Sequence, residues 1–160
     1  MTADTETTDT ETTDTENADT ENADTENADT ENADSAAVLA AADAIIDDFA
    51  NHRTAAYFAG FAADATFVFH TAERRLESRD DYERLWALWE IDDGFRVHGC
   101  TSSDRRVQLL GDTAVFTHSV HSAIELGGET TEVDERETIV FARRDGRWIA
   151  VHEHLSAVSA

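Results

Sequence analysis

The stretch DGRWIAVHEHLS, residues 145–156, decides the predicted fold because it has the pattern of a β-strand that follows a tight turn. It opens with an Asp-Gly pair, a two-residue hairpin signal, and apolar and polar residues then alternate. Alternate side chains of a strand share a face, so His152, His154 and Ser156 point to one side. The opposite side carries Val151, Glu153 and Leu155.

Three further strand-like segments precede this stretch and are joined by short turns. They cover residues 95–110, 113–126 and 130–144, and the turns between them are Gly111-Asp112 and Gly127-Gly128. Two-residue links of Gly and Asp connect neighbouring antiparallel strands. The second half of the chain is therefore predicted to be a four-stranded antiparallel meander.

The residues before the meander have helical spacing instead. Apolar residues recur at three- and four-residue steps from Ser35, which is a suitable N-cap. Residues 54–64 predict a short second helix, the sequence TFVFH at 66–70 predicts a strand, and a capping box from Ser78 to Asp81 opens a third helix. Helices followed by an antiparallel meander predict an α+β domain.

The tight turns also predict which strand residues lie opposite each other. Counting back from them places His118 opposite Glu137, and Glu137 opposite His154. The face shared with His154 is the more apolar one and carries Val107, Leu109, Phe116, Val120, Ile139, Phe141, Trp148 and Ala150. We therefore expect His152, His154 and Ser156 to point inward under the helices, although a bulge or a slip of one residue would reverse this orientation.

Residues 5–34 form six pentads, TETTD twice and then TENAD four times. They contain no Val, Ile, Leu or aromatic residue that could fill a core, and their charge is high. Such a composition predicts disorder. We expect an acidic disordered tail over residues 1–35 and a folded domain over residues 36–160.

The charge of the chain limits its partners. There are 35 Asp and Glu residues against 12 basic residues, all of them Arg, which gives a net charge of −23. Phosphates would be repelled, so neither nucleic acid nor an anionic membrane is an expected partner. An acid excess without Lys is typical of a salt-loving organism, and a GC-rich genome is the alternative explanation. The single cysteine, Cys100, and the lack of a visible secretory signal favour a cytoplasmic location.

The predicted domain resembles the SnoaL-like proteins of the nuclear transport factor 2-like superfamily, which includes the ketosteroid isomerases. The resemblance covers residues 36–160 and rests on three segments: FAADATFVFH at 61–70, RLESRDDYERLW at 75–86, and the closing DGRWIAVHEHLS. It implies a cone-shaped, curved antiparallel sheet packed against N-terminal helices around a pocket, and it implies that dimers are common. Superfamily members include isomerases, cyclases, dehydratases, ligand binders and association domains, so the resemblance does not assign an activity.

Three polar residues are the candidate catalytic group because the predicted pairing makes them cross-strand neighbours: His118, Glu137 and His154. A carboxylate between two imidazoles would fix a tautomer and raise the pKa of a histidine, which suits a general base. The alternatives are a buried hydrogen-bond network that only orders the sheet, or a metal site, for which no local ligand motif is present. The candidate ligand-binding residues are His70, Trp86, Trp89, Tyr57, Phe116, His152 and Ser156.

Two functions are compatible with this sequence. The first is a protein that holds a small organic molecule in an apolar pocket, with isomerase-like or hydratase-like acid–base chemistry left open. The second is a non-catalytic association module that dimerises through the opposite sheet face, where the aliphatic residues are Val115, Val140, Ile149, Val151 and Leu155. A homodimer is expected. No cofactor is expected, because the sequence has no P-loop, dinucleotide-binding glycine pattern or nucleophilic-serine elbow.

Overall fold

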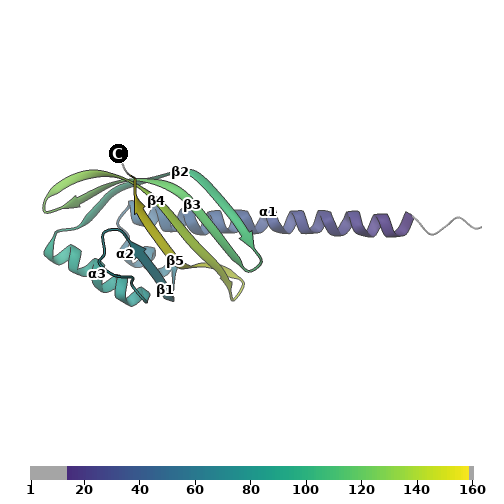
Figure 1. Cartoon of the computed structure of the whole chain (residues 1–160), viewed down its shortest axis with the longest axis horizontal. Helices are drawn as coiled ribbons and strands as arrows, with labels where there is room; N and C mark the ends of the chain where they lie inside the picture. Colours follow the sequence, from purple (N-terminus) through teal and green to yellow (C-terminus); the bar gives the residue numbers. More distant parts are fainter. Residues whose placement is uncertain (1–13, 159–160) are drawn as a thin grey trace, which may run out of the picture. The chain divides into compact units, whose positions relative to one another are not determined.

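The computed structural model describes residues 14–158, with side chains described from residue 23 onward (Figure 1). Contacts divide the chain into two units, Met1–Ala33 and Asp34–Ala160. The elements are α1 (Asp14–Ala50), α2 (Thr54–Ala59), β1 (Phe61–Phe69), α3 (Arg79–Asp92), β2 (Arg96–Leu110), β3 (Thr113–Leu126), β4 (Glu129–Arg144) and β5 (Arg147–Ala157). No helix within residues 14–158 is long and apolar enough to cross a membrane.

Helix α1 begins inside the pentad repeat, and residues 23–33 are all exposed. The repeat contains neither Pro nor Gly, and its Glu and Ala residues favour helix. Side-chain hydrogen bonds there are local, such as the bond from Thr30 Oγ1 to the Glu26 carbonyl at 2.8 Å. A helix without an apolar face gains nothing from tertiary packing. Disorder of residues 1–35 therefore stays a prediction, and residues 1–13 lie outside the described part of the chain.

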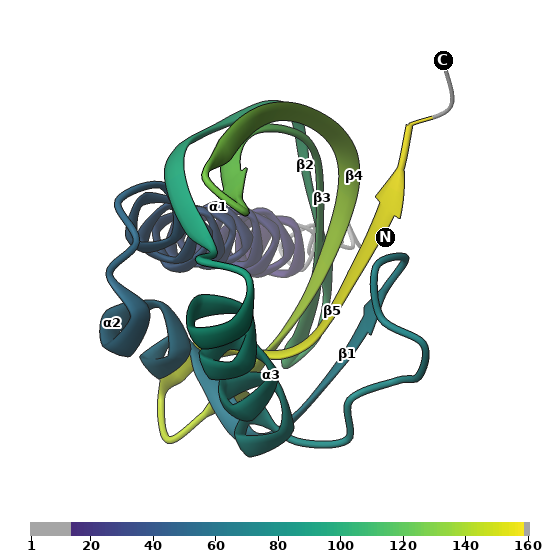
Figure 2. The same ribbon diagram turned by 90° about the vertical axis from the view of Figure 1, so that its left-hand side faces the viewer.

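The second unit is built on a five-stranded sheet in the order β1-β5-β4-β3-β2. Strand β1 pairs parallel with β5, and the other pairs are antiparallel, which confirms the predicted meander. Figure 2 shows the sheet curving over the helices. Register shifts in β2, between Val97 and Gly99 and between Ser103 and Arg106, mark bulges of the kind that bend a strand. The α+β class, with a curved, unclosed sheet against N-terminal helices, is confirmed.

The core forms between the concave face of the sheet and the helices. All the residues predicted for the apolar face are buried there or pack against the buried cluster. Helix α1 contributes Val38, Ala42 and Ile45, which are at most 5% exposed. The predicted amphipathic face of this helix is thus the face that the sheet covers.

Helix α2 is shorter than predicted, because the chain turns at Gly60 and enters β1 at Phe61. A Cβ atom at residue 60 would lie 2.6 Å from Ile45 Cγ1, so glycine permits α1 and the start of β1 to approach closely. Phe61 pairs with Ala150 of β5 and is fully buried. Pairing with a distant strand outweighs the helix propensity of the alanines in residues 61–65.

The predicted orientation of the last strand is wrong beyond Ala150. The β4–β5 pairing follows the expected register from the turn as far as Phe141 opposite Ala150, but Val140 then lies opposite His152. Val151 is the extra residue of a β-bulge. The bulge reverses the faces, so Glu153 is 3% exposed and inward, whereas His154 is exposed. Glu137 consequently lies opposite Leu155 rather than His154.

Candidate functional site

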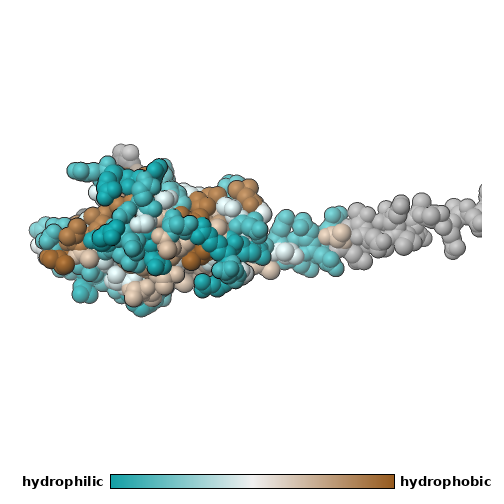
Figure 3. All heavy atoms as spheres, turned by 90° about the horizontal axis from the view of Figure 1, so that it is seen from below, coloured by the Kyte–Doolittle hydropathy of each residue, from teal (hydrophilic) through white to brown (hydrophobic). Residues whose placement is uncertain are grey.

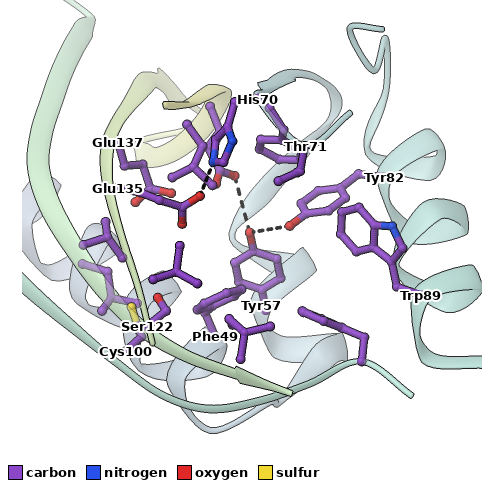
Figure 4. Close-up of a pocket in the computed structure, with 18 of the residues that line it drawn as sticks. Phe49, Tyr57, His70, Thr71, Tyr82, Trp89, Cys100, Ser122, Glu135 and Glu137 are labelled. Carbon is purple, nitrogen blue, oxygen red and sulfur yellow. Dashed lines mark hydrogen bonds and ion pairs between the residues drawn. The ribbon is translucent and has the colours of Figure 1, made fainter. Parts of the chain in front are cut away.

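A cavity of about 360 Å³ lies between the concave face of the sheet and the helices (Figure 4). Aromatic side chains from the helices form one wall, and acidic side chains from the strands form the opposite wall. Its lining residues are mostly apolar, namely Ile45, Ile46, Phe49, Phe69, Trp89, Phe95, Val120, Ile124, Leu126, Val133 and Leu155. Small-molecule sites are typically apolar cavities of this size with a few converging polar groups.

A chain of hydrogen bonds joins the two walls. The Tyr57 hydroxyl, from α2, donates to Glu153 Oε2 at 3.4 Å. The Tyr82 hydroxyl, from α3, lies 3.3 Å from the Tyr57 hydroxyl. A phenol has a single O–H group, and Tyr57 uses its O–H group in the hydrogen bond to Glu153. Tyr82 is therefore the donor in the hydrogen bond between the two tyrosines. Both tyrosines are at most 4% exposed.

Glu153 is a neutral acid in this environment. Burial raises the pKa of its carboxyl well above the ordinary value, and the charge of Glu137 and a hydrogen bond with Glu137 raise it further. The bond from Tyr57 opposes this shift but does not cancel it. As a neutral acid, Glu153 is the donor in its hydrogen bond with Glu137.

Glu137 is the ionised member of the pair. Burial alone would raise its pKa, but the hydrogen bonds that it receives from His118 and Glu153 outweigh burial and leave its pKa below the ordinary value. His118 Nε2 contacts Glu137 Oε2, and the imidazole has no exposed side-chain surface. On its other side, His118 Nδ1 lies 2.7 Å from Ser102 Oγ. Two adjacent carboxyl groups are thus held in different protonation states, which is typical of sites that move protons.

Burial also raises the pKa of both tyrosine hydroxyls well above the ordinary value, and the negative charge of Glu137 adds to the effect. Both phenols therefore stay protonated at neutral pH. They act as hydrogen-bond donors and not as bases.

A further carboxylate, Glu135, lines the cavity beside a partly exposed histidine. His70, just after β1, contacts Glu135 Oε1 through its Nε2 atom. The His70 side chain is 32% exposed and the Glu135 side chain 11%. The pair joins the end of β1 to β4 and borders the cavity beside Thr71.

Ser122 and Cys100 line the cavity from β3 and β2. Ser122 is 2% exposed, and its Oγ has no hydrogen-bond partner among the described residues. Burial raises the pKa of the Cys100 thiol to about 11, which Ser122 offsets in part. Ser122 Oγ nonetheless makes no hydrogen bond to the thiol or to any other described residue. Cys100 is consequently a protonated thiol and a poor nucleophile.

The structure brings some of the predicted site residues together. Glu137, His70, Tyr57 and Trp89 line the cavity. His118 lies behind Glu137, to which it bonds as predicted from their opposed positions in β3 and β4.

Other predicted site residues lie elsewhere. Trp86 and Phe116 are at most 1% exposed in the core and do not line the cavity. His152 lies on the outer face, where its Nδ1 is 2.8 Å from Thr66 Oγ1. Ser156 Oγ bonds to the Arg136 carbonyl, and exposed His154 is also outside the cavity. The β5 bulge accounts for these three positions, and it removes His154 from the group that was the candidate metal site.

Sequence reasoning missed several cavity residues. Glu135 lies two residues before Glu137 on the same face of β4, so the alternation rule would have found it. Glu153 was assigned to the outer face because a bulge at Val151 has no clear signature in the residue types there. Tyr82 and Cys100 were not among the candidate site residues, yet both line the cavity.

A family model described as a SnoaL-like domain matches residues 38–160, which is most of the chain. The chain belongs to the SnoaL-like domain family. No curated protein sequence matches it.

Solved structures with the nuclear transport factor 2-like fold share the architecture of this SnoaL-like chain. A candidate dehydratase from Streptomyces avermitilis is 22% identical, with a TM-score of 0.65, over 81% of this chain and 99% of that one. A candidate ketosteroid isomerase from Parabacteroides distasonis is 16% identical, with a TM-score of 0.60, over 76% and 86%. A candidate calcium/calmodulin dependent protein kinase II association domain from Xanthomonas campestris is 22% identical, with a TM-score of 0.61, over 76% and 85%. These similarities establish the fold, and the activity has to be inferred from the residues of the site.

Proposed function

We propose that this SnoaL-like protein binds a small organic molecule in the cavity and moves a proton on it with Glu137 and Glu153. The observation that carries the proposal is that Glu137 and Glu153 lie together on one wall of an apolar cavity, where His118 bonds to Glu137 and Tyr57 bonds to Glu153. Their surroundings shift the two pKa values in opposite directions. Such pairs arise where the environment drives two pKa values apart, and they supply a base and an acid at the same pH.

The two carboxyl groups have complementary tasks in this proposal. Glu137 accepts a proton from the ligand and becomes neutral, and Glu153 returns a proton to a different ligand atom and becomes ionised. No net proton is gained or lost, as an isomerisation requires. A dehydration uses the same two groups, because the proton from Glu153 leaves with the departing hydroxyl as water. The names of two structural relatives, a candidate isomerase and a candidate dehydratase, agree with this reaction class.

A thermal-shift screen of small apolar molecules tests the proposal, because a ligand that binds the folded state raises the unfolding midpoint. We expect Glu137→Gln and Glu153→Gln to weaken binding, or turnover, of any molecule that the wild type binds. His154→Ala is the matched control, since His154 is exposed outside the cavity. If His154→Ala lost the ligand and both glutamine variants kept it, the site would be placed wrongly.

A second candidate function is association, and the outer face of the sheet supports it. Val115, Val140, Ile149 and Val151 are only partly buried in the single chain. Leu155, which was predicted for the same face, lines the cavity instead because of the bulge. Apolar residues also reach the surface elsewhere, as Figure 3 shows for the molecule seen from below. Two structural relatives are described as candidate association domains.

The oligomeric state checks this second candidate. We expect a dimer in sedimentation, and Val140→Glu should weaken it by placing a charge in the middle of the outer sheet face. Leu88→Glu is the control, because Leu88 is 53% exposed on α3, away from the sheet. A monomeric wild type, or a dimer weakened by both changes equally, would count against the sheet interface.

A further inference from the structure

The phenol and carboxylic acid donors at the acidic wall are already used within the protein. Tyr82 donates to Tyr57, Tyr57 donates to Glu153, and Glu153 as a neutral acid donates to Glu137. His118 donates to the same Glu137 carboxylate from behind. Because each of these hydroxyl protons has a partner while Glu137 is ionised, the resting wall offers no free phenol or carboxylic proton to an incoming carbonyl or oxyanion, and the Glu153 proton is released only after Glu137 has taken one from a ligand.

Acceptor capacity remains on the same wall. Only Oε1 of Glu135 is bonded to His70, and only Oε2 of Glu137 is bonded to His118. An ionised carboxylate can accept about four hydrogen bonds, so both groups have lone pairs left. The buried Ser122 Oγ, which also lines the cavity, has no partner among the described residues. A serine hydroxyl can both donate and accept, and leaving it unsatisfied in the interior is costly, so a ligand group that bonds to it would be stabilised.

The lining of the cavity is acidic, although Glu153 itself is neutral. Four acidic residues line it, no arginine does, and His70 is the only basic residue of the lining: the acids are Asp93, Glu135, Glu137 and Glu153. Burial is the main cause of the raised pKa of the Cys100 thiol, and the negative charges of Glu137 and Glu135 add to it. A carboxylate or phosphate ligand would be repelled in this low-dielectric space.

The opposite wall suits an apolar body that carries positive charge. Trp89 and Phe95 lie with ring centroids 5.6 Å apart, and Tyr82 lies 6.2 Å from Trp89. Aromatic rings bury apolar surface, and their faces attract cations. Together, the two walls are complementary to a hydrophobic molecule that carries N–H donors at one end.

We infer that the cavity binds a compact apolar cation, a protonated amine on a hydrophobic ring system, whose N–H groups bond to Glu135, Glu137 and Ser122. The inference rests on the proposed function only in taking the cavity as a ligand site, and it does not need the proton-transfer step. Neutral and anionic molecules of the same shape are the disfavoured ligands.

Three probes with one ring system test the charge requirement: 2-naphthylmethylamine, 2-naphthylmethanol and 2-naphthoate. Calorimetric titration of the full chain at pH 7 gives their affinities. We expect the amine to bind about tenfold more tightly than the alcohol, the effect of one hydrogen bond between charged groups, and the naphthoate to bind most weakly. Glu135→Gln and Ser122→Ala should reduce the preference for the amine over the alcohol. Glu132→Gln should not, because Glu132 is 62% exposed and outside the cavity.

The outcomes separate this inference from the proposed function. If the alcohol bound as tightly as the amine, or the naphthoate bound most tightly, the cation inference would be overturned while the cavity remained a ligand site. If none of the three probes bound, the inference would be overturned and the proposed function would lose support as well. The affinity ratio in the wild type decides the matter even if a variant fails to fold.

Discussion

Replacing Glu153 with Gln should make the folded protein more stable at neutral pH, although Glu153 is a buried group with several bonds. Gln has the shape of the neutral acid. Its amide can donate to Glu137 and its carbonyl can accept from Tyr57, as the acid does now. Unlike Glu153, it does not have to be protonated to fold into this site.

The sign follows from the direction of the pKa shift. The pKa of Glu153 is raised in the folded state, so the folded state binds the proton more tightly than the unfolded state does. The resulting stabilisation is fully present below the unfolded pKa, about 4.3, and is lost as pH rises toward the folded pKa. Each pH unit across that interval lowers the free energy of unfolding of the wild type by about 1.4 kcal/mol relative to the variant.

Urea denaturation of both proteins at several pH values between 5 and 8 measures this difference. We expect the two curves of stability against pH to diverge steadily, with the variant more stable at the higher pH. Infrared spectra should show a protonated carboxyl band at neutral pH that the variant lacks. If the variant were less stable at every pH, Glu153 would be ionised in the folded protein and the proposed acid–base pair would not exist.

Glu137→Gln is the matched comparison, because the pKa of Glu137 is shifted the other way. A lowered folded pKa contributes stability that is present above the unfolded pKa and is lost as pH falls. Gln at this position deprives buried His118 of its carboxylate, which leaves a polar group poorly satisfied. Stability at neutral pH should therefore fall in this variant and rise in Glu153→Gln.

The position of a site residue could be predicted from the sequence only where its strand pair is regular. The β3–β4 pair runs without irregularity from Leu126 opposite Glu129 to Thr113 opposite Ala142, so counting from the turn placed His118 correctly against Glu137. Short-range signals, such as the Asp-Gly turn and the alternation of apolar residues, were enough there.

The remaining parts depend on contacts between distant segments. The bulge at Val151 lies where β5 pairs with β4 on one side and with β1 on the other, and Glu153 lies beside Phe67 of β1. Nothing in the residues HEH shows which of the three is inward, because one extra residue reverses all of them. The acid of the proposed pair was for this reason assigned to the wrong face, while its partner was found.

The largest loss of stability is expected at Trp86, which the sequence could not distinguish from Trp89. Trp86 is 1% exposed, its ring centroid lies 4.8 Å from that of Phe95, and its Nε1 donates to Glu90 Oε1 at 2.8 Å. Truncating a fully buried Trp removes its burial and leaves a cavity. Trp86→Ala should therefore lower the free energy of unfolding by about 3–5 kcal/mol, out of a typical total of about 5–15 kcal/mol.

Trp89→Ala should have the opposite profile, because Trp89 is only partly buried and lines the ligand cavity. We expect a smaller loss of stability, since one side of the ring already faces open space, and a clear loss of affinity for 2-naphthylmethylamine. Trp86→Phe, which keeps an aromatic ring in the core, should retain most of that affinity. Urea denaturation and calorimetric titration of the three variants give both quantities. Equal destabilisation by Trp86→Ala and Trp89→Ala, with affinity unchanged in Trp89→Ala, would make both tryptophans core residues and remove the aromatic wall from the proposed site.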